Sequence, residues 1–321
     1  MLTLAQVFAG MPNKISGVVI DEFRKSSWLL DNLLFDDTTV NGSGGASWIY
    51  SYERITQQAD AQVRAYGVDY TPSEAAKTPF TVDLKLLGGS FQVDRAFVNT
   101  ANTAANVATQ IIQKRKAITA LFNNLVINGD DASNPDEFDG LDVILTGSST
   151  EYIPATPIDL SSTATITANA DRFNFEFNEF LSSLDTTEGV VLFCNKLMTG
   201  RLRALAQKLS SYTTTMQDIV DGKQRQVERI IGIPFVDMGE RNGSSSLVIP
   251  ITATLTDIYA VRIAQDGFHG LMPNVKDDFI KLYLPDMNTP GVSKTGELEM
   301  ITSVALKSTK AAGVFRNLKV Q

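Results

Sequence analysis

The feature that most constrains the fold of this chain is a helical pattern over residues 99–128, which contain no proline. Apolar residues recur there at spacings of three, four or seven, the pattern of an amphipathic helix: Val107, Ile111, Ile118, Leu121 and Leu125. Asn99 or Thr100 can cap its start, and Asn128-Gly129 supplies a left-handed stop. Such a helix would be roughly 40 Å long. Since no sustained heptad accompanies it, we expect a single spine that couples neighbouring elements.

Two strand patterns precede this helix, over residues 47–55 and 80–86, and we expect them to pair. Trp48, Tyr50 and Tyr52 share one face of the first strand. Residues 56–79, between the strands, hold charges and two prolines but few aliphatic side chains, so they cannot bury themselves. A connection of this length predicts either a lid over a site or an arm that reaches a neighbouring subunit.

Apolar alternation resumes after Gly88-Gly89 with Phe91 and Val93 on the opposite parity. This switch predicts a bulge or bend at the two glycines, where the strand feeds the long helix.

Composition narrows the chemistry that the chain can perform. Its 321 residues carry a formal charge of -8, which argues against nucleic-acid binding by net attraction. One cysteine, Cys194, excludes an intrachain disulfide framework, and one histidine, His269, excludes most Cys/His metal sites and the usual histidine-dependent triads. The N-terminus lacks the pattern of a signal peptide, and no apolar run approaches a membrane span, so we expect a cytosolic chain without a membrane partner.

The remaining elements alternate in type along the chain. A helical patch is predicted over residues 16–34, and a turn-rich loop over 128–141 is followed by a strand over 143–145. The middle predicts helices at 172–184 and 196–209 and strands at 190–193, 230–236 and 247–251. Strands are then expected at 258–263, 280–284, 298–306 and 314–320, the last two with apolar residues at even positions.

Four groups of residues could carry chemistry, and each has a plainer structural interpretation. An acidic cluster could hold a hard cation, but its spacing does not fit an EF-hand loop, so a solvated turn is favoured: Asp130, Asp131, Asp136, Glu137, Asp139 and Asp142. Lys114-Arg115-Lys116 point in three directions around the long helix, which favours a solvated face. His269 and Cys194 are interpreted as structural residues. We therefore predict no catalytic residue, metal site or cofactor.

The order of these parts resembles that of the major capsid proteins of tailed phages, whose shell fold is shared with encapsulins. The resemblance covers nearly the whole chain. Its most specific piece is Asn128-Gly129-Asp130 followed by Pro135 and Gly140-Leu141, similar to a turn of that family. Residues 231–236, Ile-Gly-Ile-Pro-Phe-Val, also look like a strand of the family's axial domain.

The resemblance implies an α+β capsid fold of the Hong Kong ninety-seven type. Residues 1–38 would form an N-terminal arm, 39–97 an extended two-stranded loop, and 98–150 the spine helix and peripheral domain. Residues 151–270 would form the axial domain, and 271–321 would return to the peripheral domain as strands. Crosslinking through a loop lysine occurs in some relatives, and Lys77 or Lys85 would be candidates by position alone; solvated charges are the favoured interpretation.

The expected function is that of a non-enzymatic shell subunit of a phage head. Pentamers and hexamers of one chain would close into an icosahedral shell that encloses double-stranded DNA, contacted weakly and without sequence specificity. A separate scaffold, a portal and a decoration protein are possible partners, and the chain would be assembled in the host cytoplasm and reside in the virion. The predicted intersubunit contacts are Trp48, Tyr50, Tyr52, Arg54, Asp60, Arg64 and Glu74. Two alternatives stay open: an encapsulin-like compartment for a cargo enzyme, and a metal-dependent enzyme that uses the acidic turn.

Overall fold

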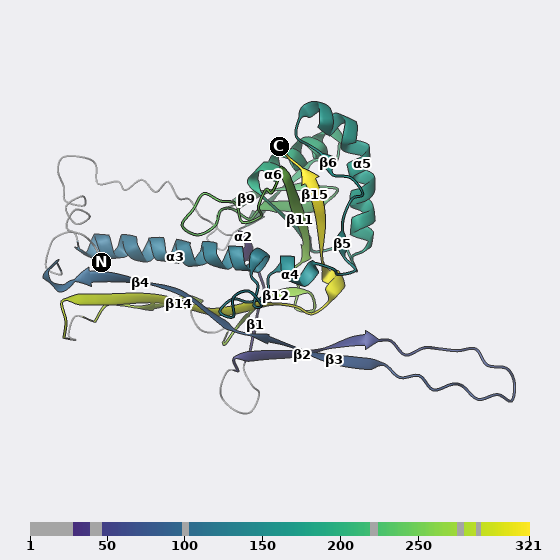
Figure 1. The fold of residues 1–321 in the computed structure, drawn as a ribbon, viewed down its shortest axis with the longest axis horizontal. Coiled ribbons are helices and arrows are strands. Elements are labelled where there is room, and N and C mark those ends of the chain that lie inside the picture. The colour runs from purple at the N-terminus through teal and green to yellow at the C-terminus, as the bar shows by residue number, and fades with distance from the viewer. Residues whose placement is uncertain (1–27, 39–46, 98–102, 219–223, 275–278, 287–289) are drawn as a thin grey trace.

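The computed structural model describes residues 28–38, 47–97, 103–218, 224–274, 279–286 and 290–321. A long helix lies along two long strands, and a compact unit of helices and strands stands over one end of that helix (Figure 1). A two-stranded loop projects from the same end, clear of the rest. The described part of the chain therefore forms an elongated body with one projecting loop.

Helix α3, Thr103–Asn128, is the predicted long helix, and its 26 residues give it a length of about 39 Å. Residues 98–102, where its start is predicted, lie outside the described residues. The predicted apolar stripe is confirmed. Ile118, Phe122 and Leu125 are buried in the larger of two main cores, and Val107 and Ile111 pack against the edge of that core.

A five-stranded sheet supports α3. Its strands are β1 (Phe35–Asp37), β12 (Phe268–Met272), β14 (Ser293–Leu306), β13 (Lys281–Tyr283) and β4 (Lys85–Asp94). Strand β14 pairs antiparallel with the whole of β4, from Ser293 opposite Asp94 to Thr302 opposite Lys85. Leu298, Met300 and Val304 of β14 are buried, as the even parity predicts, and they carry α3 on this face of the sheet.

The predicted parity switch is present, but it lies at Leu84 and not at Gly88-Gly89. Leu84 separates β3, Ala76–Asp83, from β4, and its amide donates a 2.9 Å hydrogen bond to the carbonyl of Trp48. The two glycines lie inside β4 because neighbours approach closely. A Cβ on Gly88 would lie 2.7 Å from the Leu298 carbonyl oxygen, and one on Gly89 would lie 3.2 Å from the side chain of Lys114.

The compact unit is built on an eight-stranded sheet. In order its strands are β5 (Glu151–Tyr152), β15 (Ala312–Lys319), β11 (Leu255–Arg262), β7 (Val190–Cys194), β10 (Ile233–Asp237), β9 (Gln224–Ile230) and β8 (Thr213–Asp218), with β6 (Ile158–Asp159) also on β15. Helices α5, Thr163–Ser182, and α6, Lys196–Lys208, pack in the second core with this sheet.

Capping residues explain where α5 and α6 begin, and aromatic packing explains how α5 is held. Ser162 caps α5 in a capping box, and the Asn195 side chain accepts a hydrogen bond from the Met198 amide at the start of α6. Phe173, Phe177 and Phe180 of α5 surround Phe315 of β15, with ring centroids 5.5–6.1 Å from it. The last strand is therefore held in this second core.

The strands within residues 271–321, which were expected to return to the peripheral domain, divide between the two sheets. Strands β13 and β14 lie in the five-stranded sheet. Strand β15 instead pairs with β11 in the eight-stranded sheet, from Leu255 opposite Lys319 to Val261 opposite Ala312. Local alternation could not reveal this, because the pattern of a strand does not specify its partner.

Three local predictions are also wrong. Residues 141–145 form a short helix, α4 (Leu141–Leu145), where a strand was expected. The strand expected over 230–236 is two strands, β9 and β10, separated by a turn at Ile231 and Gly232, both at positive φ. Within residues 247–251 the structure has only an isolated bridge from Leu247 to Glu240.

Near the start of the described chain, α2 (Trp28–Asn32) lies within the predicted helical patch; residues 16–27 lie outside the described residues.

The turn after α3 is held by two glycines whose backbones almost touch. The Gly140 amide donates a 2.8 Å hydrogen bond to the Gly129 carbonyl, and a Cβ on Gly140 would lie 2.6 Å from the Leu125 carbonyl oxygen. The acidic residues in between serve this turn. Asp130 accepts from the amide of Ala132 and the hydroxyl of Ser133, and Asp139 accepts from the amide of Asp131. The carboxylates of Asp130 and Asp139 thus hold the turn through hydrogen bonds within it.

Candidate functional site

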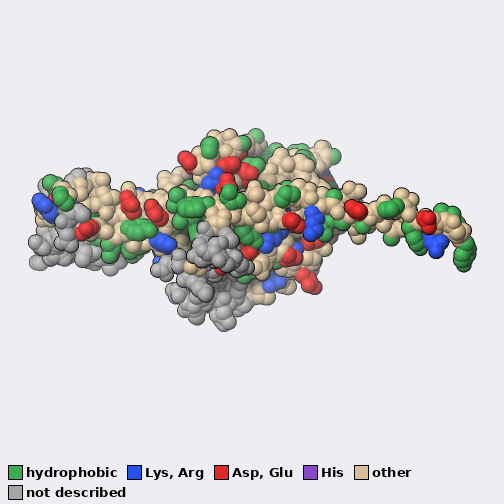
Figure 2. All heavy atoms as spheres, turned by 90° about the horizontal axis from the view of Figure 1, so that it is seen from below, with side chains coloured by type: hydrophobic (Ala, Val, Ile, Leu, Met, Phe, Trp, Pro, Cys, Tyr) green, Lys and Arg blue, Asp and Glu red, His purple; other side chains and the backbone are tan. Residues whose placement is uncertain are grey.

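The extended loop, residues 49–83, is the most distinctive surface of the molecule. It consists of strand β2 (Ile49–Gln57), strand β3 (Ala76–Asp83) and a tip, residues 58–75. The strands pair antiparallel from Ile49 opposite Asp83 to Gln57 opposite Ala76, with an irregularity next to Ile55. The predicted pairing is confirmed, and the loop stands clear of the body in both views (Figures 1 and 2).

The tip exposes large apolar side chains on a segment without a core of its own. Val63 and Tyr66 are fully exposed, and Val68 and Tyr70 are more than half exposed. The Arg64 guanidinium lies over the ring of Tyr70, 5.3 Å from its centroid, and donates to the Val68 carbonyl. Figure 2 shows apolar and charged side chains together at this end of the molecule. Soluble monomers seldom present such a segment unless it binds something.

The base of the loop is tied to its own chain by three side chains of β2. The Tyr50 hydroxyl donates to Asp36 of β1 at 2.7 Å, and the Tyr52 hydroxyl donates to the Leu306 carbonyl at 3.0 Å. Arg54 donates to the carbonyls of Leu306 and Lys307 at 2.9 and 3.0 Å. The guanidinium of Arg54 also lies over the ring of Phe80, 4.4 Å from its centroid.

We call these three side chains, with Asp36, Leu306 and Lys307, the anchor of the extended loop. Apolar packing beneath it is limited to a small cluster in which Leu84, Leu271 and Ala305 are buried and Tyr50, Tyr52 and Val82 are partly buried. The polar contacts of the anchor therefore contribute a large share of what holds the loop at its angle.

Electrostatics strengthen one side of the anchor. Burial alone would raise the pKa of Asp36, but the Tyr50 hydrogen bond and the cation of Lys307, 3.7 Å away, outweigh it and lower that pKa. Burial and the Asp36 carboxylate together raise the pKa of Tyr50. Asp36 is thus held as an anion and Tyr50 as a neutral donor across the neutral pH range.

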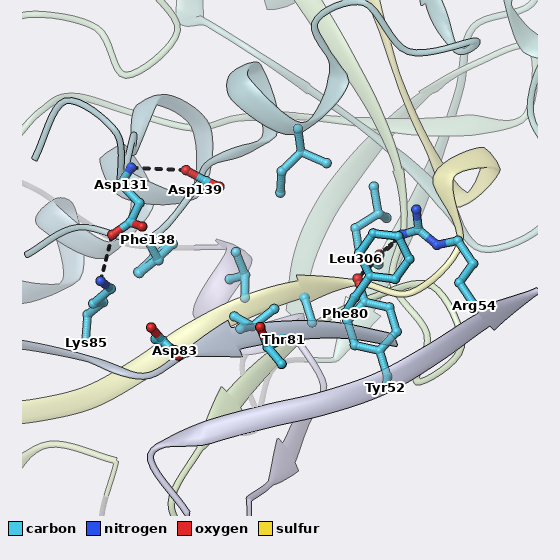
Figure 3. A pocket seen from close by; sticks show the side chains of 14 residues that line it. Tyr52, Arg54, Phe80, Thr81, Asp83, Lys85, Asp131, Phe138, Asp139 and Leu306 are labelled. Carbon is cyan, nitrogen blue, oxygen red and sulfur yellow. Dashed lines mark hydrogen bonds and ion pairs between the residues drawn. The ribbon is translucent and has the colours of Figure 1, made fainter. Parts of the chain in front are cut away.

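A cavity of about 400 Å³ lies where the extended loop meets the body. Tyr52, Arg54 and Phe80 form one wall, and Lys85, Asp131 and Asp139 lie at the other end (Figure 3). Lys85 donates to the Asp131 carboxylate at 2.8 Å and to the Pro135 carbonyl at 2.6 Å. Lys85 therefore ties the start of β4 to the turn after α3.

The predicted contact residues fall into two groups. Tyr50, Tyr52 and Arg54 belong to the anchor within their own chain, while Asp60, Arg64 and Glu74 lie exposed in the tip and Trp48 lies half exposed beside the base. An intersubunit role for any of the seven stays a prediction. Sequence reasoning missed Asp36, Leu306 and Lys307, because two of them act through backbone carbonyls that no side-chain pattern reveals.

The other candidate groups occupy structural positions. Among the described residues, no group of three or more His, Cys, Asp or Glu side chains could hold a metal ion. Asp142 lies outside the acidic turn, on α4, where it pairs with Arg316 at 2.8 Å. Cys194 is buried, and burial raises the pKa of its thiol to about 12. The ammonium of Lys77 is exposed and pairs with Glu53 at 3.1 Å.

The helix cations do not form one patch. The Lys114 side chain lies against the backbone of Gly89, and Arg115 is exposed. In the described part of the chain no helix is both long and apolar enough to cross a membrane.

Comparison by sequence and by structure gives different results. No protein-family model and no curated protein match the chain. Its structure resembles an encapsulin, solved as the holo-SrpI complex of Synechococcus elongatus, with a TM-score of 0.65 and 13% identity over 99% of this chain and 95% of that one. The capsid of a native GTA particle matches with a TM-score of 0.61 and 10% identity over 98% and 97% of the two chains.

The capsid of cyanophage A-1(L) is similar to the same degree, with a TM-score of 0.61 and 11% identity over 96% of this chain and 97% of that one. Each match spans nearly the whole of both chains. The chain therefore has the mixed α+β fold of the tailed-phage major capsid proteins, the Hong Kong ninety-seven type fold that encapsulins share.

Proposed function

We propose that this chain is the major capsid protein of a tailed bacteriophage, and that it acts by self-assembly without turnover. The observation that carries the proposal is the extended loop, whose tip leaves Val63 and Tyr66 fully exposed although the fold is that of capsid subunits. A second copy of the chain is the partner that a shell supplies at every such tip.

The mechanism is geometric. Strand β2 has nine residues and spans about 30 Å. Half of the tip, if extended, adds up to about 30 Å more. The end of the tip therefore lies far beyond its own body. The anchor fixes the direction of this reach, and α3 with β4 and β14 gives it a rigid support. Heterologous contacts of this kind close into rings of five and six, and the rings close into a shell.

The exposed side chains of the tip, which include the predicted contacts Asp60, Arg64 and Glu74, suit this role. Val63 and Tyr66 supply apolar area, while Asp60, Arg64 and Glu74 supply charges for pairs at the rim of the contact. Packaged DNA would be held by the closed shell, with weak contacts that lack sequence specificity, in keeping with the net charge of -8. A separate scaffold, a portal and a decoration protein would complete the particle, which would assemble in the host cytoplasm.

An encapsulin-like shell is the second candidate, because an encapsulin is among the most similar solved structures. Both candidates use the same assembly geometry and differ in contents. Particles purified from the organism that produces them would contain double-stranded DNA in the first case and a cargo protein in the second.

The assembly step is tested with a double substitution in the tip. Val63→Ser with Tyr66→Ser should keep the circular dichroism spectrum and melting temperature of the parent, since neither side chain is buried, yet assemble poorly by sedimentation and negative-stain microscopy. The matched control, Val63→Ile with Tyr66→Phe, keeps the apolar area and should assemble. A parent chain that stays monomeric at every concentration, with or without its coexpressed scaffold, would show the proposal to be wrong.

A further inference from the structure

His269 lies at the base of the extended loop with a nitrogen that has no hydrogen-bond partner among the described residues. The residue is fully buried on β12, opposite Ala305 of β14. Its Nδ1 lies 3.4 Å from the Gly267 carbonyl oxygen, and its Nε2 is buried with no hydrogen-bond partner in the part of the chain that the structure describes. Buried polar atoms in folded proteins are normally paired, so this one calls for an explanation.

The imidazole is part of the joint between loop and body. The Tyr50 ring meets it edge-on, with centroids 5.9 Å apart, and the same Tyr50 donates to Asp36. Leu271 and Ala305, on the same face of the sheet, are buried under the loop, and the Ser303 hydroxyl there is also buried with no partner among the residues that the structure describes. Movement of the ring must therefore disturb Tyr50 and the small apolar cluster around it.

Two opposite charges act on the ring: the Lys307 cation opposes a second proton, and the Asp36 carboxylate favours it. Lys307 lies at the end of β14, with its ammonium over the Tyr50 ring, 5.3 Å from the centroid. Asp36 on β1 is the carboxylate that acts on the ring, and it already accepts a hydrogen bond from Tyr50 and pairs with Lys307. Tyr50 and Tyr52 face the site from β2 as neutral phenols, and Arg54 extends past Tyr52 to the carbonyls of Leu306 and Lys307.

We propose that protonation of His269 releases the base of the extended loop from its own subunit, so that the loop can change its angle to the body. An imidazolium in this joint would place an N–H donor where the described residues supply no acceptor, and pairing it with the Asp36 carboxylate would take Asp36 from Tyr50. Either route loosens the Tyr50 side of the anchor, while the backbone contacts of Tyr52 and Arg54 remain as a tether.

The sign of the effect follows from linkage. Burial, and then the Lys307 cation, lower the pKa of His269 below its ordinary value of 6.5. The closed joint therefore favours the neutral ring, and an open joint with a solvated ring binds the proton more readily. Opening should increase by up to about tenfold per pH unit as the pH falls below 6.5, and level off below the pKa of the closed joint.

This inference concerns a joint within one chain and holds whether or not the chain forms a shell. It is tested by hydrogen exchange with mass spectrometry on the full chain, between pH 7.5 and 4.5, with rates corrected for intrinsic exchange. Peptides from β2 and β3 should lose protection below pH 6.5, while β7 in the second core serves as the reference. Loss at all sites together, or no loss in β2 and β3, would overturn the proposal.

Two variants test whether the pH response of β2 and β3 comes from the imidazole ring of His269. His269→Gln cannot take up a proton, so it should abolish the pH response of β2 and β3; an unchanged response would overturn the proposal. Should that variant fail to fold, Lys307→Gln provides the decision. Removing the cation should move the midpoint of the opening to higher pH, and an unmoved or lower midpoint would count against the role of His269.

Discussion

The hydroxyl of Tyr52 donates a 3.0 Å hydrogen bond to the carbonyl oxygen of Leu306, a residue 254 positions further along the chain. Arg54 reaches the same carbonyl at 2.9 Å. These two contacts join the extended loop to the end of the longest strand of the five-stranded sheet. The angle of the loop is thus set by backbone atoms of a strand that is itself held over the whole of β4.

Removing the anchor contacts should loosen the loop without unfolding the chain. Arg54→Ala deletes two hydrogen bonds to carbonyls and the contact with Phe80, worth about 1–2 kcal/mol together at this partly exposed site. We expect exchange of β2 and β3 amides to rise about 5–30-fold at neutral pH, with the global unfolding midpoint in urea unchanged. Arg64→Ala removes the same charge but only contacts within the tip, so it should leave β2 and β3 protected.

Shortening the extended loop should separate assembly from folding. Replacing residues 58–75 by Asn-Gly keeps β2 and β3 and closes them with a favoured hairpin turn. No described residue of the tip belongs to a hydrophobic core, so cooperative melting should persist, while particle yield in the electron microscope falls sharply. Loss of the folded state in this variant would contradict the assignment of these residues as a projecting element.

The turn in which the backbones of Gly129 and Gly140 meet should tolerate no side chain at Gly140. A Cβ on Gly140 would lie 2.6 Å from the Leu125 carbonyl oxygen and 2.7 Å from the Gly129 nitrogen, both backbone atoms that cannot rotate away. Gly140→Ala should therefore cost about 1–3 kcal/mol in urea unfolding. The control is Gly200→Ala in α6, where nothing lies within 4 Å of the added Cβ. There we expect a gain of about 0.5–1 kcal/mol.

Removing Arg316 from its ion cluster should destabilise the chain less in acid than at neutral pH. Arg316 pairs with Asp142 at 2.8 Å and Asp257 at 3.0 Å, and also with Glu151. Burial already raises the pKa of Asp257, against the opposing effect of Arg316. Arg316→Met leaves these carboxylates without their cation and should cost about 3 kcal/mol at pH 7.

That loss should shrink as the pH falls, because a carboxyl with a raised pKa binds its proton more readily in the folded chain than in the unfolded one. Urea unfolding at pH 7 and pH 5 measures the difference between variant and parent. Arg203→Met removes a pair with Glu228 that is half exposed on the arginine side, so about 0–1 kcal/mol is expected. An equal cost for both variants would show that the Arg316 cluster is not special.

The sequence predicts those parts of the fold that depend on short-range pattern. The long helix, the two strands of the loop, β7, α6 and the alternation along β14 follow from apolar spacing and capping residues. Residues 141–145 mislead, because Leu, Val and Ile over so short a run suit a strand or a single helical turn equally well. Tertiary contacts of Leu141 and Leu145 decide for the helix.

Local sequence patterns do not reveal which strands pair in a sheet, or which atoms the anchor residues bind. Strand β15 has the alternation of any half-buried strand, and only the packing of Phe315 against α5 places it in the eight-stranded sheet. The sequence predicts Tyr52 and Arg54 as intersubunit contacts, but their acceptors within the chain are backbone carbonyls more than 250 positions away. Nothing in the local pattern around Leu306 marks its carbonyl as a binding partner.

The hydrogen bond from Leu84 to Trp48 closes the extended loop where it leaves the body. Because the two ends of the loop meet at this point, the whole segment behaves as an insertion whose length and sequence can vary while the rest of the fold stays intact. Foreign peptides could therefore be inserted into this segment near Gly67, which lies at positive φ with open space around it. Related chains could equally exchange this loop as a unit and change the spacing between subunits without redesigning either core.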